Sequence, residues 1–82
     1  MGSSSKWVPL QALKPHRKGI VREILVDGPL TQRMLDLGLV PSTLVEVVRE
    51  APLGGPVTYR VRGCYLAMRR TEAAYILVEE VD

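Results

Sequence analysis

The sequence predicts a mostly β protein: a small barrel of about five strands, with one short α-helix and one further helical turn. Three observations support this fold class. The chain has 82 residues, enough for one domain. Runs of β-branched and aliphatic residues alternate with Pro- and Gly-rich turn segments. Two of these runs are joined by a tight hairpin, which a doubly wound parallel sheet does not contain, and closure into a barrel would remove the edges of so short a sheet.

The first predicted strand, residues 19–26, reads Gly-Ile-Val-Arg-Glu-Ile-Leu-Val and stops at the turn residues Asp-Gly-Pro. From Leu30 onward the apolar residues recur at helical spacing, which predicts a helix of about two turns. Gly38 stands where a left-handed residue closes a helix, and Leu39 can fold back onto Met34 as the apolar contact of such a cap. A β-branched residue at Gly38 should therefore be costly.

The remaining elements are shorter. Strands are predicted at residues 44–49, 57–62, 65–69 and 75–79, and a single helical turn at residues 71–74 with Thr71 as its N-cap. Alternation in the second of these strands places Val57, Tyr59 and Val61 on the inner face. Gly63-Cys64 has glycine at the first central position, as a type II′ hairpin turn requires.

Residues 51–56, Ala-Pro-Leu-Gly-Gly-Pro, form a stiff loop that should project from the sheet. In one interpretation, Pro52, Leu53 and Pro56 present apolar surface to a partner. In the other, Leu53 folds back and plugs one end of the barrel. The sequence leaves both open.

Composition limits the function classes. A net charge of +2 with a pI of about 9.0 is a mild basic excess, so nucleic acid is not the expected partner. The single cysteine, Cys64, excludes an internal disulfide and fits a cytoplasmic location. No apolar stretch approaches the ~18 residues that cross a bilayer, so direct membrane insertion is not expected. We interpret residues 1–7 as a flexible tail or cloning remnant and residues 8–82 as the domain.

Residues with catalytic or metal-binding chemistry are few. His16 and Cys64 lack the spacing of metal ligands, so we expect neither a metal site nor a cofactor beyond an adventitious ion at His16. No base can be assigned beside Cys64, and the segment after Gly38 lacks the lysine of a phosphate-binding loop. We therefore expect a protein that is not an enzyme.

Three segments resemble the motifs of the FeoA family, in the same order and spacing. They are residues 33–41 (RMLDLGLVP), 49–56 (REAPLGGP) and 66–78 (LAMRRTEAAYILV). The resemblance spans about residues 8–80. Two positions depart from the family pattern, because Ser42 replaces a glycine and Gly55 replaces an aspartate.

The resemblance implies an SH3-like barrel that assists FeoB, the membrane protein of bacterial ferrous iron uptake, by docking on its cytosolic GTP-binding part. No helix-turn-helix segment precedes residue 8, so we expect a stand-alone FeoA domain. The arginines among the candidate docking residues could also act on a partner's GTPase, although solvated surface positions explain them more simply. The candidate docking residues are Arg33, Gly38, Pro52, Leu53, Gly54, Pro56, Arg69 and Arg70.

Two other functions stay open: a nucleic-acid-binding small barrel and a metal-dependent regulatory module, which would self-associate with metal. The sequence leaves the oligomeric state open, a homo-oligomer included. Against nucleic acid, Tyr59 should face inward and acidic residues dilute the basic field. The residues that would carry nucleic-acid binding are Lys14, Arg17, Lys18, Arg22, Arg60, Arg62, Arg69 and Arg70, interleaved with Tyr59, Tyr65 and Tyr75.

Overall fold

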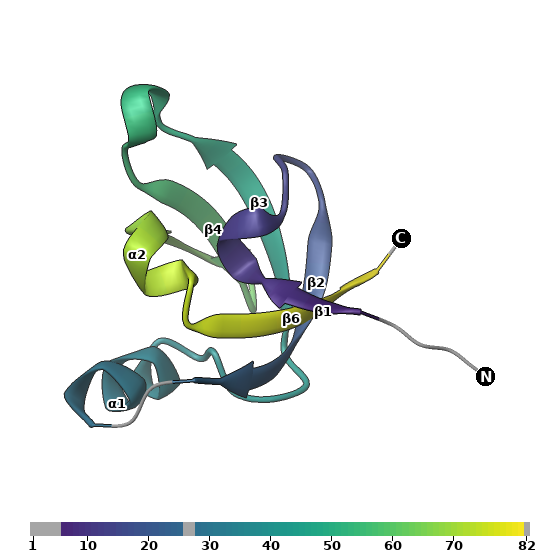
Figure 1. Ribbon diagram of the computed structural model, residues 1–82, viewed down its shortest axis with the longest axis vertical. Coiled ribbons are helices and arrows are strands. Elements are labelled where there is room, and N and C mark those ends of the chain that lie inside the picture. Colours follow the sequence, from purple (N-terminus) through teal and green to yellow (C-terminus); the bar gives the residue numbers. More distant parts are fainter. Residues whose placement is uncertain (1–5, 26–27, 82) are drawn as a thin grey trace.

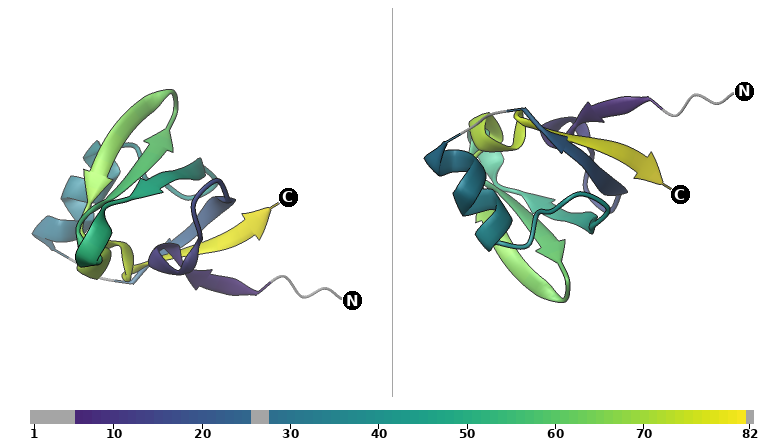
Figure 2. Two further views of the ribbon diagram at one scale, coloured as in Figure 1. Left: turned by 90° about the horizontal axis from the view of Figure 1, so that it is seen from above. Right: turned by 90° about the horizontal axis from the view of Figure 1, so that it is seen from below.

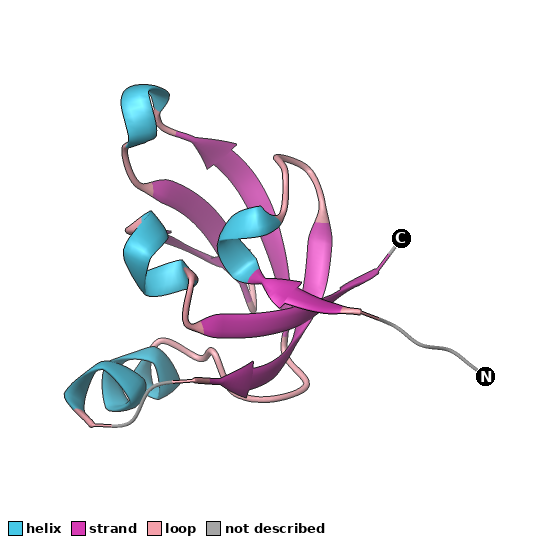
Figure 3. Cartoon of the chain, in the orientation of Figure 1, coloured by secondary structure: helices cyan, strands magenta, loops and turns pink. Residues whose placement is uncertain are grey.

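The protein is described here by a computed structural model, which covers residues 6–25 and 28–81. Within these residues the chain forms strands, two short α-helices and two 3₁₀ turns, as Figures 1 and 3 show. The strands are β1 (Trp7–Pro9), β2 (Lys18–Ile24), β3 (Leu44–Glu50), β4 (Val57–Val61), β5 (Cys64–Met68) and β6 (Ile76–Val81). The helices are α1 (Pro29–Asp36) and α2 (Arg70–Ala73), and the 3₁₀ turns are η1 (Leu10–Ala12) and η2 (Pro52–Gly54).

All six described strands belong to one antiparallel sheet in the order β1-β6-β2-β3-β4-β5. The sheet curls strongly, so that β4 and β5 fold over β1 and β6 across the interior (Figure 2). Its hydrogen-bonded order is nevertheless open, with β1 and β5 as edges. The mostly β fold class is confirmed, while the sheet has six strands where the sequence predicts about five.

The additional strand is β1, which the sequence analysis missed. It has only three residues, one of them Pro9, and it pairs with β6 through Trp7 and Glu79, Val8 and Val78, and Pro9 and Leu77. A three-residue segment that contains proline has no strand signal of its own. Its pairing depends on a strand about seventy residues away in the chain.

The core lies inside the curled sheet and is almost entirely apolar. The inner face of β4 is as predicted, because Val57, Tyr59 and Val61 are each at most 2% exposed. The 3₁₀ turn η1 contributes Leu10 to the same cluster. The buried apolar residues are Leu10, Leu13, Val21, Met34, Leu39, Val45, Val47, Val57, Tyr59, Val61, Met68, Ala73, Ile76 and Val78.

Helix α1 ends in the predicted glycine cap. Gly38 has φ +94°, and its N–H donates to the carbonyl oxygen of Leu35 at 3.0 Å. The N–H of Leu39 donates back to the carbonyl oxygen of Met34, also at 3.0 Å. These two bonds define a Schellman motif, and both Leu39 and Met34 belong to the core cluster. The cap therefore fixes where the chain turns from α1 toward β3.

The hairpin between β4 and β5 differs from the prediction by one residue. Val61 pairs with Cys64, so the two central turn residues are Arg62 and Gly63, with φ +53° and +79°. Positive φ at both central positions is the type I′ turn, whose twist suits a two-residue hairpin. The predicted type II′ turn at Gly63-Cys64 is wrong, and Cys64 is instead the first residue of β5.

Boundaries near the C-terminus also differ from the prediction. The N-cap of α2 is Arg69 rather than Thr71, because the Glu72 carboxylate accepts a hydrogen bond from the Arg69 N–H at 3.0 Å. Thr71 lies within the helix, and β6 begins at Ile76. The first predicted strand, residues 19–26, corresponds to β2, and Val26 lies outside the described residues.

Candidate functional site

Three elements lie one after another along one side of the molecule: the loop that carries η2, then α2, then α1 (Figure 1). One shallow hollow there is lined by Arg33, Pro56, Ala67, Arg69 and Glu72. A second hollow shares Pro56 and Arg69 with it and extends toward Gly54 and Arg70. We call this surface the loop–helix face, defined by Arg33, Leu53, Gly54, Pro56, Ala67, Arg69, Arg70 and Glu72.

The loop of this face is closed by its own backbone. The N–H of Ala51 donates to the carbonyl oxygen of Pro56 at 3.0 Å, and the N–H of Gly55 donates to that of Pro52 at 3.3 Å. At the tip, Leu53 adopts φ +60° and its exposure is 104% of the reference value. Leu53 thus does not fold back to plug the barrel. The loop holds an apolar side chain fully in solvent, a costly position for leucine.

Charges on the loop–helix face are largely paired. The Arg33 guanidinium lies 3.1 Å from the Glu72 carboxylate, and the Arg70 guanidinium lies 3.4 Å from that of Glu50. Glu72 also accepts from the Arg69 N–H, so it joins α1 to the start of α2. The Arg69 side chain has no carboxylate within salt-bridge distance among the described residues. Of the three predicted arginines, Arg69 is therefore the one that a partner could engage without breaking an existing pair.

Two of the predicted docking residues lie elsewhere. A Cβ at Gly38 would face Val61 and Arg62 at 3.8 and 3.9 Å, which places the end of α1 beside the Arg62–Gly63 turn, at the other end of β4 from the loop. Pro52 lines an adjoining hollow with Arg49 and Thr58, and this hollow shares Pro56 and Ala67 with the loop–helix face. The structure thus brings Arg33, Gly54, Pro56, Arg69 and Arg70 together and separates Gly38 from them.

Beneath this face lies Tyr59, the largest fully buried side chain. Burial raises the pKa of Tyr59 to about 12; the Arg70 guanidinium lowers this pKa by a smaller amount, and the Glu50 carboxylate raises it slightly. The ion pair between Arg70 and Glu50 therefore lies close enough to Tyr59 to act on its ionisation. Tyr59 is unavailable as a stacking surface for a base, as the sequence predicts.

Groups with metal or thiol chemistry are dispersed over the described part of the chain. His16 is exposed, and its backbone N–H donates to the carbonyl oxygen of Val47 at 2.7 Å. Cys64 is exposed on β5. Residues 6–25 and 28–81 contain no cluster of three or more His, Cys, Asp or Glu side chains able to hold a metal ion. Over the same residues, no helix is both long and apolar enough to cross a membrane.

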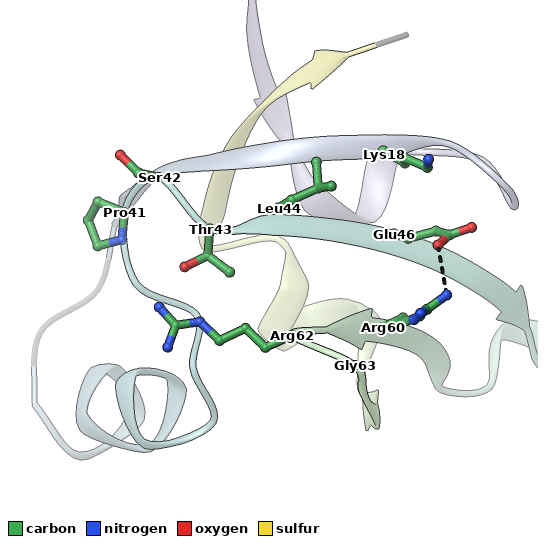
Figure 4. A pocket seen from close by; sticks show the side chains of 9 residues that line it. All are labelled: Lys18, Pro41, Ser42, Thr43, Leu44, Glu46, Arg60, Arg62 and Gly63. Carbon is green, nitrogen blue, oxygen red and sulfur yellow. Dashed lines mark ion pairs between the residues drawn. The ribbon is translucent and has the colours of Figure 1, made fainter.

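A further hollow, which the sequence analysis missed, lies over β3 at the opposite end of β4 (Figure 4). We call it the β3 groove. The sequence marked Lys18, Arg60 and Arg62 only as part of a dispersed basic set. Strand pairing was the missing signal, because Lys18 and Arg60 each pair with Glu46 across β2, β3 and β4. The groove is lined by Lys18, Pro41, Ser42, Thr43, Leu44, Glu46, Arg60, Arg62 and Gly63.

Comparison with known proteins places the chain in a family. The model of the FeoA domain matches residues 8–80. The chain is 40% identical, over 73 residues, to a Fe(2+) transport protein A/Fe(2+) transporter FeoB fusion protein of Porphyromonas gingivalis. This match covers 89% of the chain but only 9% of the fusion protein.

Two solved structures of similar fold carry the FeoA name. The FeoA-like protein of Clostridium acetobutylicum has a TM-score of 0.88 and 30% identity, with 96% of this chain and 92% of that one covered. The zinc-complexed FeoA of Stenotrophomonas maltophilia, an SH3 domain protein, has a TM-score of 0.76 and 26% identity, with 85% and 87% covered. The curled sheet is therefore an SH3-like fold.

Proposed function

We propose a function on one premise: this chain belongs to the FeoA family, whose domain model matches residues 8–80. The chain acts as an accessory protein of bacterial ferrous iron uptake. It works in the cytoplasm by docking on the GTP-binding part of a FeoB-type transporter, and it carries out no chemistry of its own. The docking surface is the loop–helix face.

The observation that carries this proposal is the fusion protein of Porphyromonas gingivalis, in which a segment 40% identical to this chain is joined to FeoB. Covalent linkage keeps two domains at a high effective concentration, which benefits a pair that must meet repeatedly. A separate chain of the same family needs a surface that replaces the linkage. Such a surface should combine an apolar anchor with polar contacts that fix its orientation.

The loop–helix face has both features. Leu53 offers an apolar anchor whose burial by a partner is worth roughly 1.5–3 kcal/mol by transfer scales. The loop around it is already closed by backbone hydrogen bonds, so little conformational entropy is lost when it docks. Arg69 lines one hollow with Gly54, the residue that follows Leu53 in the chain, and has no carboxylate partner in the described residues. It can meet an acidic group of the partner.

The test is co-purification with the cytosolic part of the FeoB-type transporter of the same organism, followed by GTPase rates with and without this protein. We expect a complex that Leu53→Asp weakens about tenfold or more at unchanged melting temperature. The matched control is Leu25→Asp, which adds the same charge at an exposed leucine outside both the loop–helix face and the β3 groove. No complex and no change in GTPase rate would remove the accessory function; equal losses in both variants would remove the loop–helix face.

A second candidate, nucleic-acid binding, has less support. Among its predicted basic residues, four form ion pairs with glutamates: Arg17 with Glu80, Arg22 with Glu79, Arg60 with Glu46 and Arg70 with Glu50. Of the three tyrosines, Tyr59 is buried. The ion pairs reduce the positive charge available to phosphates, and the burial of Tyr59 removes one aromatic surface on which a base could stack.

A further inference from the structure

The β3 groove is a hollow of about 580 Å³, within the usual range for ligand sites. At one end its walls are the segment from Pro41 to Thr43, which leads into β3, and the Arg62–Gly63 turn; Lys18, Glu46 and Arg60 line it farther along the strands (Figure 4). Hydrogen bonds to β2 fix one wall, because the Ser42 N–H donates to the Val21 carbonyl at 2.7 Å and the Thr43 carbonyl accepts from the Val21 N–H at 2.8 Å. The groove is thus a preformed feature of the folded chain.

The groove lining carries a net positive charge. It includes three cations, Lys18, Arg60 and Arg62, and one carboxylate, Glu46. The chain as a whole has 11 Lys and Arg against 9 Asp and Glu, a net charge of +2. An anionic ligand would be drawn to this part of the surface.

Internal partners neutralise these cations poorly. The Arg60 guanidinium lies 3.9 Å from the Glu46 carboxylate, at the long limit for an ion pair. Lys18 and Arg62 have no carboxylate within salt-bridge distance in residues 6–25 and 28–81. In Figure 4 the Arg62 guanidinium points toward the Pro41–Thr43 wall, away from the Arg60 and Glu46 pair. Two positive charges therefore remain open to a ligand.

Backbone strain is concentrated at the same place. Two of the four non-glycine residues with positive φ in the described chain, Ser42 (+77°) and Arg62 (+53°), stand on opposite walls of the groove. Each of them lies where glycine would be less costly. Strained backbone is common at binding sites, which is consistent with a role of the Ser42 and Arg62 side chains in binding.

The groove combines separated cations with one apolar side chain. Arg60 lies beside Glu46, whereas Arg62 points from its turn toward the Pro41–Thr43 segment, so the two guanidiniums occupy different positions along the groove (Figure 4). Leu44, which pairs with Ile20 of β2, is 48% exposed and offers an apolar contact. We propose that the β3 groove binds an extended acidic segment of a protein partner, with carboxylates facing Lys18 and Arg62 and an aliphatic residue seated on Leu44.

Nucleic acid fits this groove less well than an acidic peptide. Glu46 lies among the cations and would repel a phosphate backbone, whereas a peptide can place its carboxylates on either side of it. No tyrosine or tryptophan lines the groove, so a base has no stacking surface. The groove lies at the far end of β4 from the loop–helix face, so one chain can hold both partners at once.

The experiment is a titration of the ¹⁵N-labelled full chain, followed by NMR shifts at low salt, with a capped peptide Gly-Glu-Leu-Glu-Asp-Gly. The same peptide with Gln and Asn in place of its acids is the ligand control. We expect saturable shifts confined to the groove residues and their neighbours. Arg60→Gln combined with Arg62→Asn should weaken binding about tenfold or more, and Asn is chosen because it tolerates positive φ. Arg49→Gln, at an exposed arginine outside the groove, should change affinity by less than about twofold.

Three outcomes would overturn the proposal. One is the absence of saturable shifts with the acidic peptide. Another is an equal loss in the Arg49→Gln control, which would indicate a diffuse field rather than a site. The third is tighter binding of a mixed-sequence oligonucleotide that is lost in the double groove variant, which would make this a phosphate-binding surface. Melting curves of each variant establish that the fold is retained.

Discussion

The two ends of β4 present different chemistry to solvent. At the Val57 end, the loop–helix face pairs two of its three arginines with carboxylates and exposes an apolar tip, Leu53. At the Val61 end, the β3 groove leaves Lys18 and Arg62 without a carboxylate partner in the described chain. A surface whose charges are mostly paired and which carries an apolar protrusion suits a partner recognised mainly by shape and desolvation. Unpaired cations suit a partner recognised by charge. One small sheet thus separates two kinds of recognition.

The largest expected effect is a loss of stability at Gly38, beside the Arg62–Gly63 turn of the β3 groove. Gly38→Val should lower the free energy of unfolding by about 2–4 kcal/mol, because a β-branched residue at φ +94° is strained and the Schellman cap of α1 would be lost. Urea unfolding measures it. Gly38→Asn is the matched control, since Asn adopts positive φ, and it should cost less than half as much. Equal losses in the two variants would contradict the role given to the left-handed cap.

The next effect lies between the two ends, at Tyr59. Its pKa is raised to about 12 in the folded protein, so the unfolded chain loses this proton first as the pH rises above 10. Stability from this group is therefore complete below pH 10 and is lost as the pH rises through 12, a total of about 2–3 kcal/mol for two pH units. Urea unfolding between pH 9 and 12 should show this loss in the wild type and a shallower loss in Tyr59→Phe. Parallel curves for the two proteins would be inconsistent with a buried, protonated Tyr59.

A smaller effect concerns the paired charges of the loop–helix face. Glu72→Gln keeps an acceptor for the Arg69 N–H but loses the charge that holds Arg33. Because Arg33 is largely exposed, the loss should be only about 0.5–1 kcal/mol. Glu72→Ala also removes the N-cap bond and should cost about 1–2 kcal/mol. If both variants melt like the wild type, the bridge between α1 and α2 contributes nothing to stability.

Much of this architecture was predictable because it depends on local pattern. Alternation alone placed Val57, Tyr59 and Val61 in the core, and a glycine after a helical period placed the cap at Gly38. The hairpin turn was shifted by one residue because Arg62, a residue with no turn preference, adopts positive φ beside Gly63. Local signals cannot indicate that an arginine will be strained by the pairing of its neighbours.

The sites were only partly predictable, because long-range pairing assembles them. The loop–helix face joins Arg33 to Glu72 across 39 positions of sequence. The β3 groove depends on the register that sets Lys18 and Arg60 opposite Glu46. Without that register the basic residues read as a dispersed, solvated set. The sequence could not tell whether Leu53 is exposed or plugs the barrel. Its exposure became clear only from the backbone of the closed loop.

The most direct test of docking is the affinity of the wild type, Leu53→Asp and Leu25→Asp for the cytosolic part of the FeoB-type transporter, measured by titration calorimetry. Because the Leu53 side chain is fully exposed in the folded chain, Leu53→Asp should change the free energy of unfolding by less than about 0.5 kcal/mol. We expect an affinity loss of about tenfold or more for Leu53→Asp and less than about twofold for Leu25→Asp. Wild-type affinity in Leu53→Asp would contradict docking through the loop–helix face.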